Sequence, residues 1–292
     1  MSFDYLAAQI FNGLASGAFY ALLALGLSVI FGMLRVINFA HGALYMLGAF
    51  ATYYGAQALH LPFFAALVVA PIAVGLFGML IEVLILRRIQ GQDPVYGLLL
   101  TFALTLIIVN GMRMIAGPLG SPYAIPDALS NAVNLGFTVY PEYKLFVIVV
   151  SLAICAVAWW FVERSMLGAR IRAATENPVL VRALGVDTRR LITLAFGFGV
   201  ALAAIAGVLA APTTNVQPTM GDDIIIYTFA IVVIGGLGSI TGSIVAGFTL
   251  GVLQAIGAIT YPPIATTLIF IVMVVVIALR PAGLFGRPEA LR

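Results

Sequence analysis

The densest group of charged side chains lies between Glu163 and Arg190, in a chain that is otherwise almost wholly apolar. This segment reads ERSMLGARIRAATENPVLVRALGVDTRR and carries six of the fourteen Lys and Arg residues. Long apolar runs flank it on both sides, and charges of this density do not belong in hydrocarbon. We call residues 163–190 the polar loop, and its chemistry suits contact with a soluble partner.

Proline divides the polar loop into two short helices. Pro178 lacks an amide hydrogen and disfavours helical geometry at Asn177, so one continuous helix is excluded. Asn177 is a good N-cap, Pro178 fits the first helical position and Gly185 is placed to end the helix. The pattern predicts a helix from Pro178 to Leu184 with Val181 and Leu184 on one side.

The upstream half of the polar loop projects charge from Arg170, Arg172 and Glu176, while Ile171 and Ala174 offer a narrow apolar side. Two interpretations compete for these residues. The loop either docks a protein partner, which we favour, or anchors to lipid headgroups through its arginines.

Polar residues within the apolar runs each need a physical reason, because burial in a bilayer is costly. Helical spacing from Asn38 places His41 and Gly42 on a shared side. We expect His41 to be hydrogen-bonded between helices near the cytoplasmic boundary, rather than to relay protons. Glu82 lies a little more than one turn before Arg87 and is expected to pair locally or snorkel.

A glycine-rich stretch interrupts the second half of the chain at Gly235, Gly236 and Gly238. Glycine allows both close helix packing and a backbone break. Interrupted helices in two halves often flank a transport path, and the first-half counterpart would be residues 31–42. The candidate pathway residues are therefore Asn38, His41, Gly42, Gly235, Gly236 and Gly238.

The elements that position these residues are membrane helices. Hydrophobic residues make up 63% of the chain, charged residues 9%, and the mean hydropathy is +1.14. Several runs reach the roughly 20 apolar residues that cross a bilayer. The sequence predicts an all-α polytopic membrane protein whose residues 1–292 form a single transmembrane domain, since no polar stretch is long enough for an independent core.

Apolar runs predict eight or nine transmembrane helices. They cover residues 6–34, 38–59, 62–86, 95–114, 145–162, 191–211, 224–234, 240–259 and 264–279. The run 224–234 is short for a crossing and is either a span or a re-entrant segment.

Cation placement predicts the orientation. Lys and Arg in short loops stay cytoplasmic, and setting Arg87 and Arg88 inside places twelve cations inside against two outside, Arg113 and Lys144. The polar loop and the carboxyl terminus, with Arg35, Arg280, Arg287 and Arg292, are then cytoplasmic. Positive-inside topology explains the net charge of +3 better than nucleic-acid binding does.

The sequence lacks the motifs that several classes of function require. Lys144 is the sole lysine and stands outside any phosphate-binding glycine motif. No HExxH or GxSxG motif is present, and the two histidines, His41 and His60, fall on opposite expected sides, so a metal site or an intramembrane enzyme is not indicated. A gradient-driven secondary carrier remains an alternative, although buried charged partners are nearly absent.

Four stretches carry a resemblance to a known family. They are INFAHGALYMLGAF at residues 37–50, ARIRAATENPVLVRALGV at 169–186, VIGGLGSITGSIVAG at 233–247 and RPAGLFGRPE at 280–289. Together they resemble the permease subunits of ABC importers for branched-chain amino acids, over nearly the whole chain. The chain looks like the first of the two paralogous permeases in such an importer.

The resemblance implies an inner-membrane importer with a second permease, two cytoplasmic ATPase subunits and a periplasmic binding protein. ATP would be bound by the partners, with no cofactor or metal in this chain. The implied ATPase-coupling residues are Arg170, Arg172, Ala173, Glu176, Asn177 and Pro178. Gln217, Asp222 and Asp223 are candidate contacts for the binding protein, or simply a solvated outer loop. Branched-chain amino acids are the leading substrates, and urea, short amides and other amino acids remain alternatives.

Overall fold

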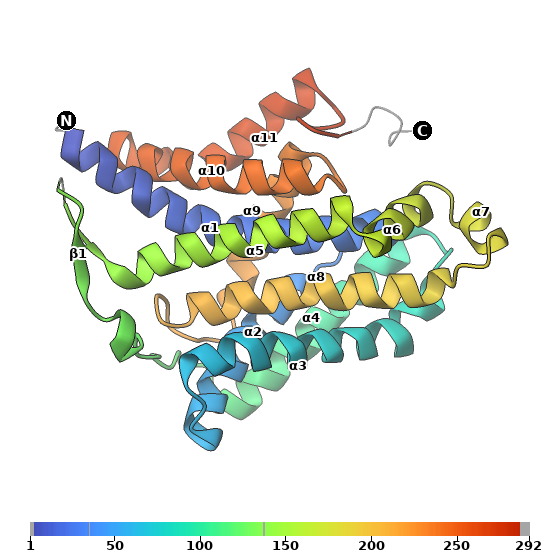
Figure 1. The fold of residues 1–292 in the computed structure, drawn as a ribbon, viewed down its shortest axis with the longest axis horizontal. Coiled ribbons are helices and arrows are strands. Elements are labelled where there is room, and N and C mark those ends of the chain that lie inside the picture. Colours follow the sequence, from blue (N-terminus) through green and yellow to red (C-terminus); the bar gives the residue numbers. More distant parts are fainter. Residues whose placement is uncertain (1–2, 35, 137, 287–292) are drawn as a thin grey trace.

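Long helices lying side by side form an elongated bundle in the computed structural model, which describes residues 3–34, 36–136 and 138–286 (Figure 1). The α-helices are α1 (Phe3–Leu34), α2 (Ala40–Leu59), α3 (Phe63–Leu84), α4 (Pro94–Ala116), α5 (Glu142–Arg164), α6 (Met166–Glu176), α7 (Pro178–Ala183), α8 (Thr188–Ala210), α9 (Met220–Gly235), α10 (Ile240–Thr260) and α11 (Leu268–Leu279). The described ranges also contain the short 3-10 helices η1 (Leu86–Ile89), η2 (Asp127–Leu129) and η3 (Pro262–Ile264).

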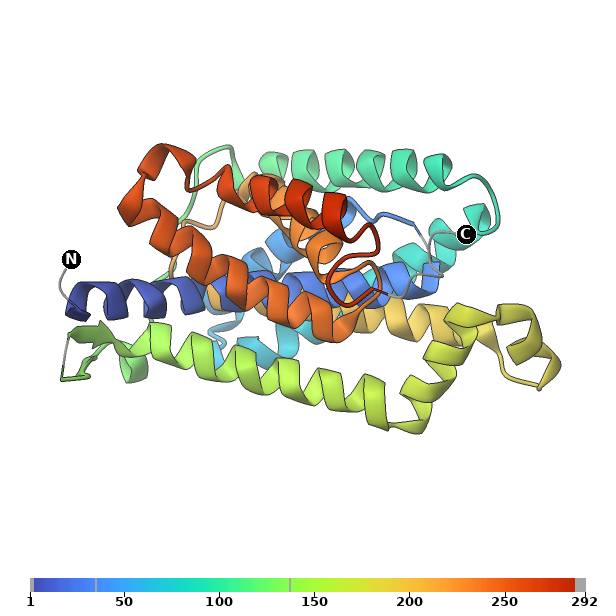
Figure 2. The same ribbon diagram turned by 90° about the horizontal axis from the view of Figure 1, so that it is seen from above.

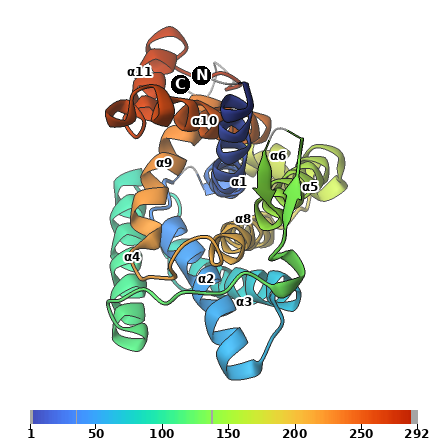
Figure 3. The same cartoon turned by 90° about the vertical axis from the view of Figure 1, so that its left-hand side faces the viewer.

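Helices α1 and α8 form the centre of the bundle. In each, 67% of the most apolar 18-residue window is buried, against 22% in α4, which stands at the edge (Figure 3). Small residues permit the central contacts: a Cβ added to Gly26 of α1 would lie 2.5 Å from the carbonyl oxygen of Gly199 in α8. The apolar faces of the outer helices are exposed, as expected for surfaces that meet lipid or another membrane chain.

Six helices within the described ranges are long and apolar enough to cross a membrane, namely α1, α3, α4, α5, α8 and α10. All six correspond to spans expected from the sequence, and the polytopic helical architecture is confirmed. The remaining three expected spans correspond to α2, α9 and α11, with 20, 16 and 12 residues. The total of eight or nine crossings stays a prediction.

The chain between α1 and α2 turns back into the bundle. Thr101 of α4 holds this turn, because its Oγ1 accepts from the amide of Phe39 at 3.2 Å and lies 3.2 Å from the carbonyl oxygen of Ile37. His41 then lies beside Leu23, eleven residues before the end of α1 and thus roughly 16 Å along its axis. Helix α2 therefore begins among other helices, deeper in the bundle than the boundary position expected for His41.

Helix α9 connects the two regions of broken helix. At its start Gly221 meets Gly42 of α2, where an added Cβ on Gly42 would lie 2.4 Å from the Gly221 carbonyl oxygen. Beyond its end, an added Cβ on Gly238 would lie 3.6 Å from Cα of Gly32 in α1. The two glycine groups thus lie at opposite ends of α9.

Opposite ends of the bundle carry different non-spanning elements (Figures 1 and 2). At one end lies a small antiparallel hairpin, β1 (Ala132–Asn134) paired with β2 (Val139–Pro141), which the all-α prediction did not include. At the other end α6 and α7 project from the bundle. Prolines and glycines in residues 117–141 favour turns over a long helix, and this permits the hairpin.

Candidate functional site

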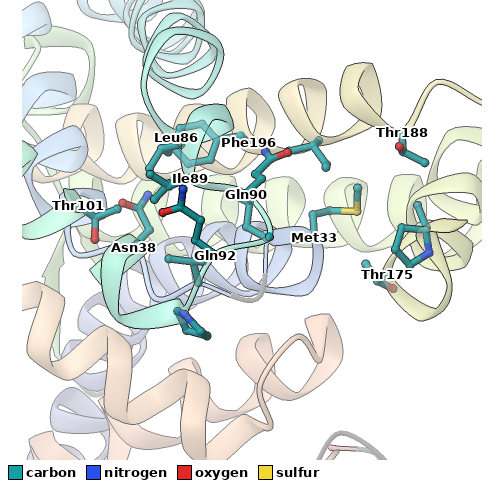
Figure 4. A pocket seen from close by; sticks show the side chains of 18 of the residues that line it. Met33, Asn38, Leu86, Ile89, Gln90, Gln92, Thr101, Thr175, Thr188 and Phe196 are labelled. Atoms are coloured by element: carbon teal, nitrogen blue, oxygen red, sulfur yellow. The ribbon is translucent and has the colours of Figure 1, made fainter. Parts of the chain in front are cut away.

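A cavity of about 550 Å³ lies at the α6–α7 end of the bundle (Figure 4). It is bounded by the end of α1 and the turn after it, by η1 and the following loop, by the start of α4, by α6 and α7, and by α8. Its lining residues are Met33, Leu34, Val36, Asn38, Leu86, Ile89, Gln90, Gly91, Gln92, Asp93, Pro94, Gly97, Thr101, Ala174, Thr175, Glu176, Pro178, Arg182, Thr188, Ile192 and Phe196.

The two ends of the cavity differ in burial and charge. Asn38 and Thr101, with relative exposures of 2% and 1%, lie at the inner end. The formally charged lining residues Asp93, Glu176 and Arg182 are all exposed. Figure 4 shows Asn38 and Thr101 at one end, with Thr175 on the other side of the cavity. The inner end is therefore neutral and polar, and the charges lie near solvent.

Asn38 has unused hydrogen-bonding capacity at this inner end. Neither its Nδ2 nor its Oδ1 has a hydrogen-bond partner among the described residues, although both atoms are buried. The hydroxyl of Thr101 is occupied by the backbone of the turn at residues 37–39. Buried amides are normally paired, so this arrangement marks Asn38 as a functional candidate.

A buried carboxylate supports the η1 wall of the cavity. Glu82, whose side chain is fully buried, accepts from Arg87 Nη2 at 2.9 Å, from Gln90 Nε2 at 3.1 Å and from Thr193 Oγ1 at 2.7 Å. These contacts join α3, η1, the next loop and α8. The expected local pairing of Glu82 with Arg87 is confirmed, and the Glu82 cluster holds the wall that presents Gln90 to the cavity.

The polar loop forms the opposite wall, and its helix boundaries follow the sequence. The Asn177 side chain accepts from the amide of Leu180 at 2.9 Å, which caps α7, and Gly185 after the helix has a φ of 81°. One detail of the prediction is wrong, because Val181 is buried while Leu184 is 74% exposed. Helix α7 ends at Ala183, so Leu184 no longer follows the helical face.

Internal contacts fasten the polar loop to the bundle. Arg172 donates from Nη1 to the carbonyl oxygen of Val162 and lies 3.6 Å from the carboxylate of Glu163, at the end of α5. Arg182 Nε donates to Thr188 Oγ1 at 2.6 Å, at the start of α8. Arg172 in the middle of α6 and Arg182 near the end of α7 thus tie these two helices to α5 and α8.

The sequence-derived candidates are brought together only in part. Three of them, Asn38, Glu176 and Pro178, line the cavity. The others are not among its lining residues: Arg170, Arg172, Ala173, Asn177, His41, Gly42, Gly235, Gly236, Gly238, Gln217, Asp222 and Asp223.

The candidates that lie apart from the cavity have local structural surroundings. His41 is fully buried with Nε2 3.1 Å from the carbonyl oxygen of Leu23, which agrees with the expected bond between helices. Gly236, with a φ of 105°, ends α9, and the amide of Phe285 donates to Gly235 O at 3.1 Å. Gln217 is exposed in the turn before α9, whereas Asp222 and Asp223, which the sequence placed in an outer loop, are exposed in the first turn of that helix.

Residues that sequence reasoning did not single out complete the cavity. Thr101 is a hydroxyl inside an otherwise apolar span, and that interruption is a signal that could have drawn attention to it. Gln90 and Gln92 stand in a short loop whose position over the cavity no sequence pattern reveals. No group of three or more His, Cys, Asp or Glu residues suited to a metal occurs within the described ranges.

Similarity to known proteins identifies the family of this chain. The family model described as the permease component of the branched-chain amino acid transport system matches residues 9–279. The chain belongs to this permease family. The matched range contains the cavity, the polar loop and all of the helices except part of α1.

Individual members of the branched-chain permease family are similar along nearly the whole chain. The high-affinity branched-chain amino acid transport system permease protein BraD of Pseudomonas aeruginosa is 30% identical, with 96% of each chain covered. LivH of Escherichia coli K12, which carries the same description, is 29% identical over 98% of this chain and 97% of its own. LivM of the same organism is 26% identical over 79% of this chain and 59% of its own.

Proposed function

We propose that this chain is the transmembrane permease subunit of an ABC importer that moves branched-chain or other hydrophobic amino acids across the inner membrane. The observation that carries the proposal is similarity over nearly the full length to permeases named for branched-chain amino acid transport. The cavity is compatible with this function. Its wall combines apolar side chains with neutral and charged polar ones, and convergent polar groups of this kind orient small molecules in their sites.

The proposed importer contains a second, paralogous permease, two cytoplasmic ATPase subunits and a periplasmic binding protein. Similarity to both LivH and LivM supports a pair of related permeases. The ATPases would bind ATP and supply the driving force. Within this proposal, eight or nine helices cross the bilayer, and the carboxyl terminus and residues 163–190 face the cytoplasm, where cations are retained.

The polar loop is the proposed contact with the ATPases. Its short helices project beyond the membrane helices, and Arg172 and Arg182 fasten them to α5 and α8. Glu176 and Pro178 also line the cavity, so one wall of the cavity belongs to the segment that would move with ATP. Closure of the ATPase pair would shift α6 and α7 and change access to the cavity.

On the other side of the membrane, Gln217, Asp222 and Asp223 are proposed to meet the binding protein. They are exposed beside the start of α9. Since that helix also contacts α2 through Gly221 and Gly42, binding there has a direct structural route to the membrane interior.

The test is ATP-dependent uptake of leucine by proteoliposomes that hold this chain with its second permease, ATPases and binding protein. Isoleucine and valine are expected to compete, whereas urea and a basic amino acid are not. Preferential uptake of urea or short amides would replace the substrate assignment. Uptake driven by an ion gradient without ATP would refute the importer class in favour of a secondary carrier.

Coupling is tested by Glu176→Gln and Arg172→Gln. Each is expected to leave membrane insertion intact while lowering the number of leucine molecules imported per ATP hydrolysed. Asp127→Asn, which removes an exposed charge in η2, outside the polar loop, is the matched control and is expected to leave this ratio unchanged. An unchanged ratio in both polar-loop variants would remove the coupling assignment.

A further inference from the structure

The side-chain amide of Asn38 is buried without a hydrogen-bond partner among the residues that the structure describes. Its relative exposure is 2%, and neither Nδ2 nor Oδ1 is hydrogen-bonded to any described residue. A carboxamide offers two donors and an acceptor with two lone pairs. Leaving all of them unused in a buried position lowers stability, so a ligand that pairs with them would be favoured there.

The backbone fixes this amide at the cavity. Asn38 lies between Ile37 and Phe39, and both of these neighbours are tied to the hydroxyl of Thr101 at 3.2 Å. The amide of His41 also donates to the carbonyl oxygen of Asn38 at 3.3 Å. The turn is thus anchored on both sides of the residue, while the buried side-chain amide has no partner among the described residues at the inner end of the cavity (Figure 4).

The surroundings define which ligand fits. Apolar side chains of Leu86, Ile89 and Phe196 line the same cavity, and the charged lining residues are exposed rather than at its inner end. An apolar wall next to neutral side-chain amides, of which Asn38 is the buried one, suits a molecule with an aliphatic part and a head that both donates and accepts hydrogen bonds. A free amino acid with an aliphatic side chain has these properties.

We propose that Asn38 is a substrate-binding residue, whose carboxamide hydrogen-bonds the carboxylate and ammonium groups of a zwitterionic aliphatic amino acid in the cavity. This inference rests on the proposed function and adds the residue that recognises the substrate. Because a neutral amide has no formal charge to pair with the head group, it holds the substrate less tightly than an ion pair would. Weak retention suits a site from which the substrate must be released.

Protection of an introduced cysteine tests binding directly. Ile89→Cys places a thiol on the cavity wall, while the native Cys155 is 1% exposed and gives a low background that the parent chain measures. The assembled importer in proteoliposomes is treated with a methanethiosulfonate reagent with and without leucine. Leucine is expected to slow labelling at least about threefold, and Asn38→Leu is expected to abolish this protection.

The matched control is Asn110→Leu, which removes an exposed amide that donates within α4, to the carbonyl oxygen of Leu106 at 2.8 Å. Protection by leucine should survive this change. Protection that also survives Asn38→Leu would overturn the proposal, as would protection by urea or acetamide but not by leucine. Absence of ATP-dependent leucine uptake by the parent complex would refute the proposed function separately, because the labelling assay needs no ATP.

Uptake and stability together distinguish binding from a structural role. Asn38→Leu is expected to reduce leucine uptake at low concentration about tenfold or more, the ratio expected for one hydrogen bond to a charged group. Its thermal unfolding midpoint is expected to be unchanged or higher, because an unpaired buried amide is replaced by an apolar group of similar size. A lower midpoint together with retained uptake would show that Asn38 is structural and would overturn the proposal.

Discussion

The Glu82 cluster offers the sharpest test of the packing described above. Glu82 is fully buried, whereas the side chain of its partner Arg87 is 30% exposed and the two are 2.9 Å apart. Removing Arg87 therefore leaves a negative charge in the interior, with the hydroxyl of Thr193 and the amide of Gln90 as its remaining donors. Removing Glu82 leaves a cation that can reach solvent.

This difference in burial between Glu82 and Arg87 sets how much each substitution should lower the free energy of unfolding. Arg87→Ala should lower the free energy of unfolding by about 3 kcal/mol, the lower end for breaking a buried ion pair, because two neutral donors remain. Glu82→Gln should cost roughly 1.5 to 3 kcal/mol through the loss of charge-assisted hydrogen bonds. Replacing both residues by Leu should cost only about 1 kcal/mol, since no charge is then left buried.

The assay is unfolding of the purified chain by titration with SDS in mixed micelles, followed by circular dichroism. Asp187→Asn is the matched control. It alters an ion pair of 3.1 Å whose side chains are 52% and 85% exposed, and it should cost at most about 1 kcal/mol. Because loss of Arg87 also removes a topology signal, Glu82→Gln checks the cluster at a constant number of cations. A double Leu variant that lost as much free energy of unfolding as the two single variants lose together would refute the argument.

Two further predictions follow from local geometry. Gly42→Ala is expected to destabilise the protein by about 1 to 3 kcal/mol in the same titration, because the new methyl group would lie 2.4 Å from the carbonyl oxygen of Gly221. Gly111→Ala, with no atom within 4 Å of the new Cβ, should be neutral or slightly stabilising, and equal losses in both variants would contradict the close packing of α2 on α9. Asn177→Ala should weaken α7 by about 1 kcal/mol through loss of its cap, seen as faster amide hydrogen exchange over residues 179–183 with unchanged exchange in α8. Unaltered exchange in α7 would show that the cap does not stabilise this helix.

Much of the fold follows from local sequence signals. Apolar runs of sufficient length predict the membrane helices, since the backbone must be internally hydrogen-bonded in lipid. The structure agrees closely for the fourth apolar run, predicted at residues 95–114 and observed as Pro94–Ala116. The capping pair Asn177 and Pro178 likewise predicts the start of α7.

Other features depend on contacts between distant segments. The apolar run at residues 38–59 does not reveal that α2 starts beside Leu23, because the return of the chain depends on Thr101 of α4. Leu184 has the right helical spacing from Val181 but lies beyond the end of α7 and is exposed. The hairpin near residues 132–141 also lacks a strong local signal, since each of its strands has three residues.

The candidate site shows the same division. Composition and motif spacing by themselves determined a polytopic helical membrane protein with a polar loop, and they marked Asn38 and Glu176 as residues that need a reason. Only the tertiary structure decided that both residues line one cavity, and that, within the described part of the chain, the side chain of Asn38 has no hydrogen-bond partner while that of Glu82 has three. Hydrophobic length is a local property of the chain, whereas the pairing of a buried polar group depends on which distant helices pack around it.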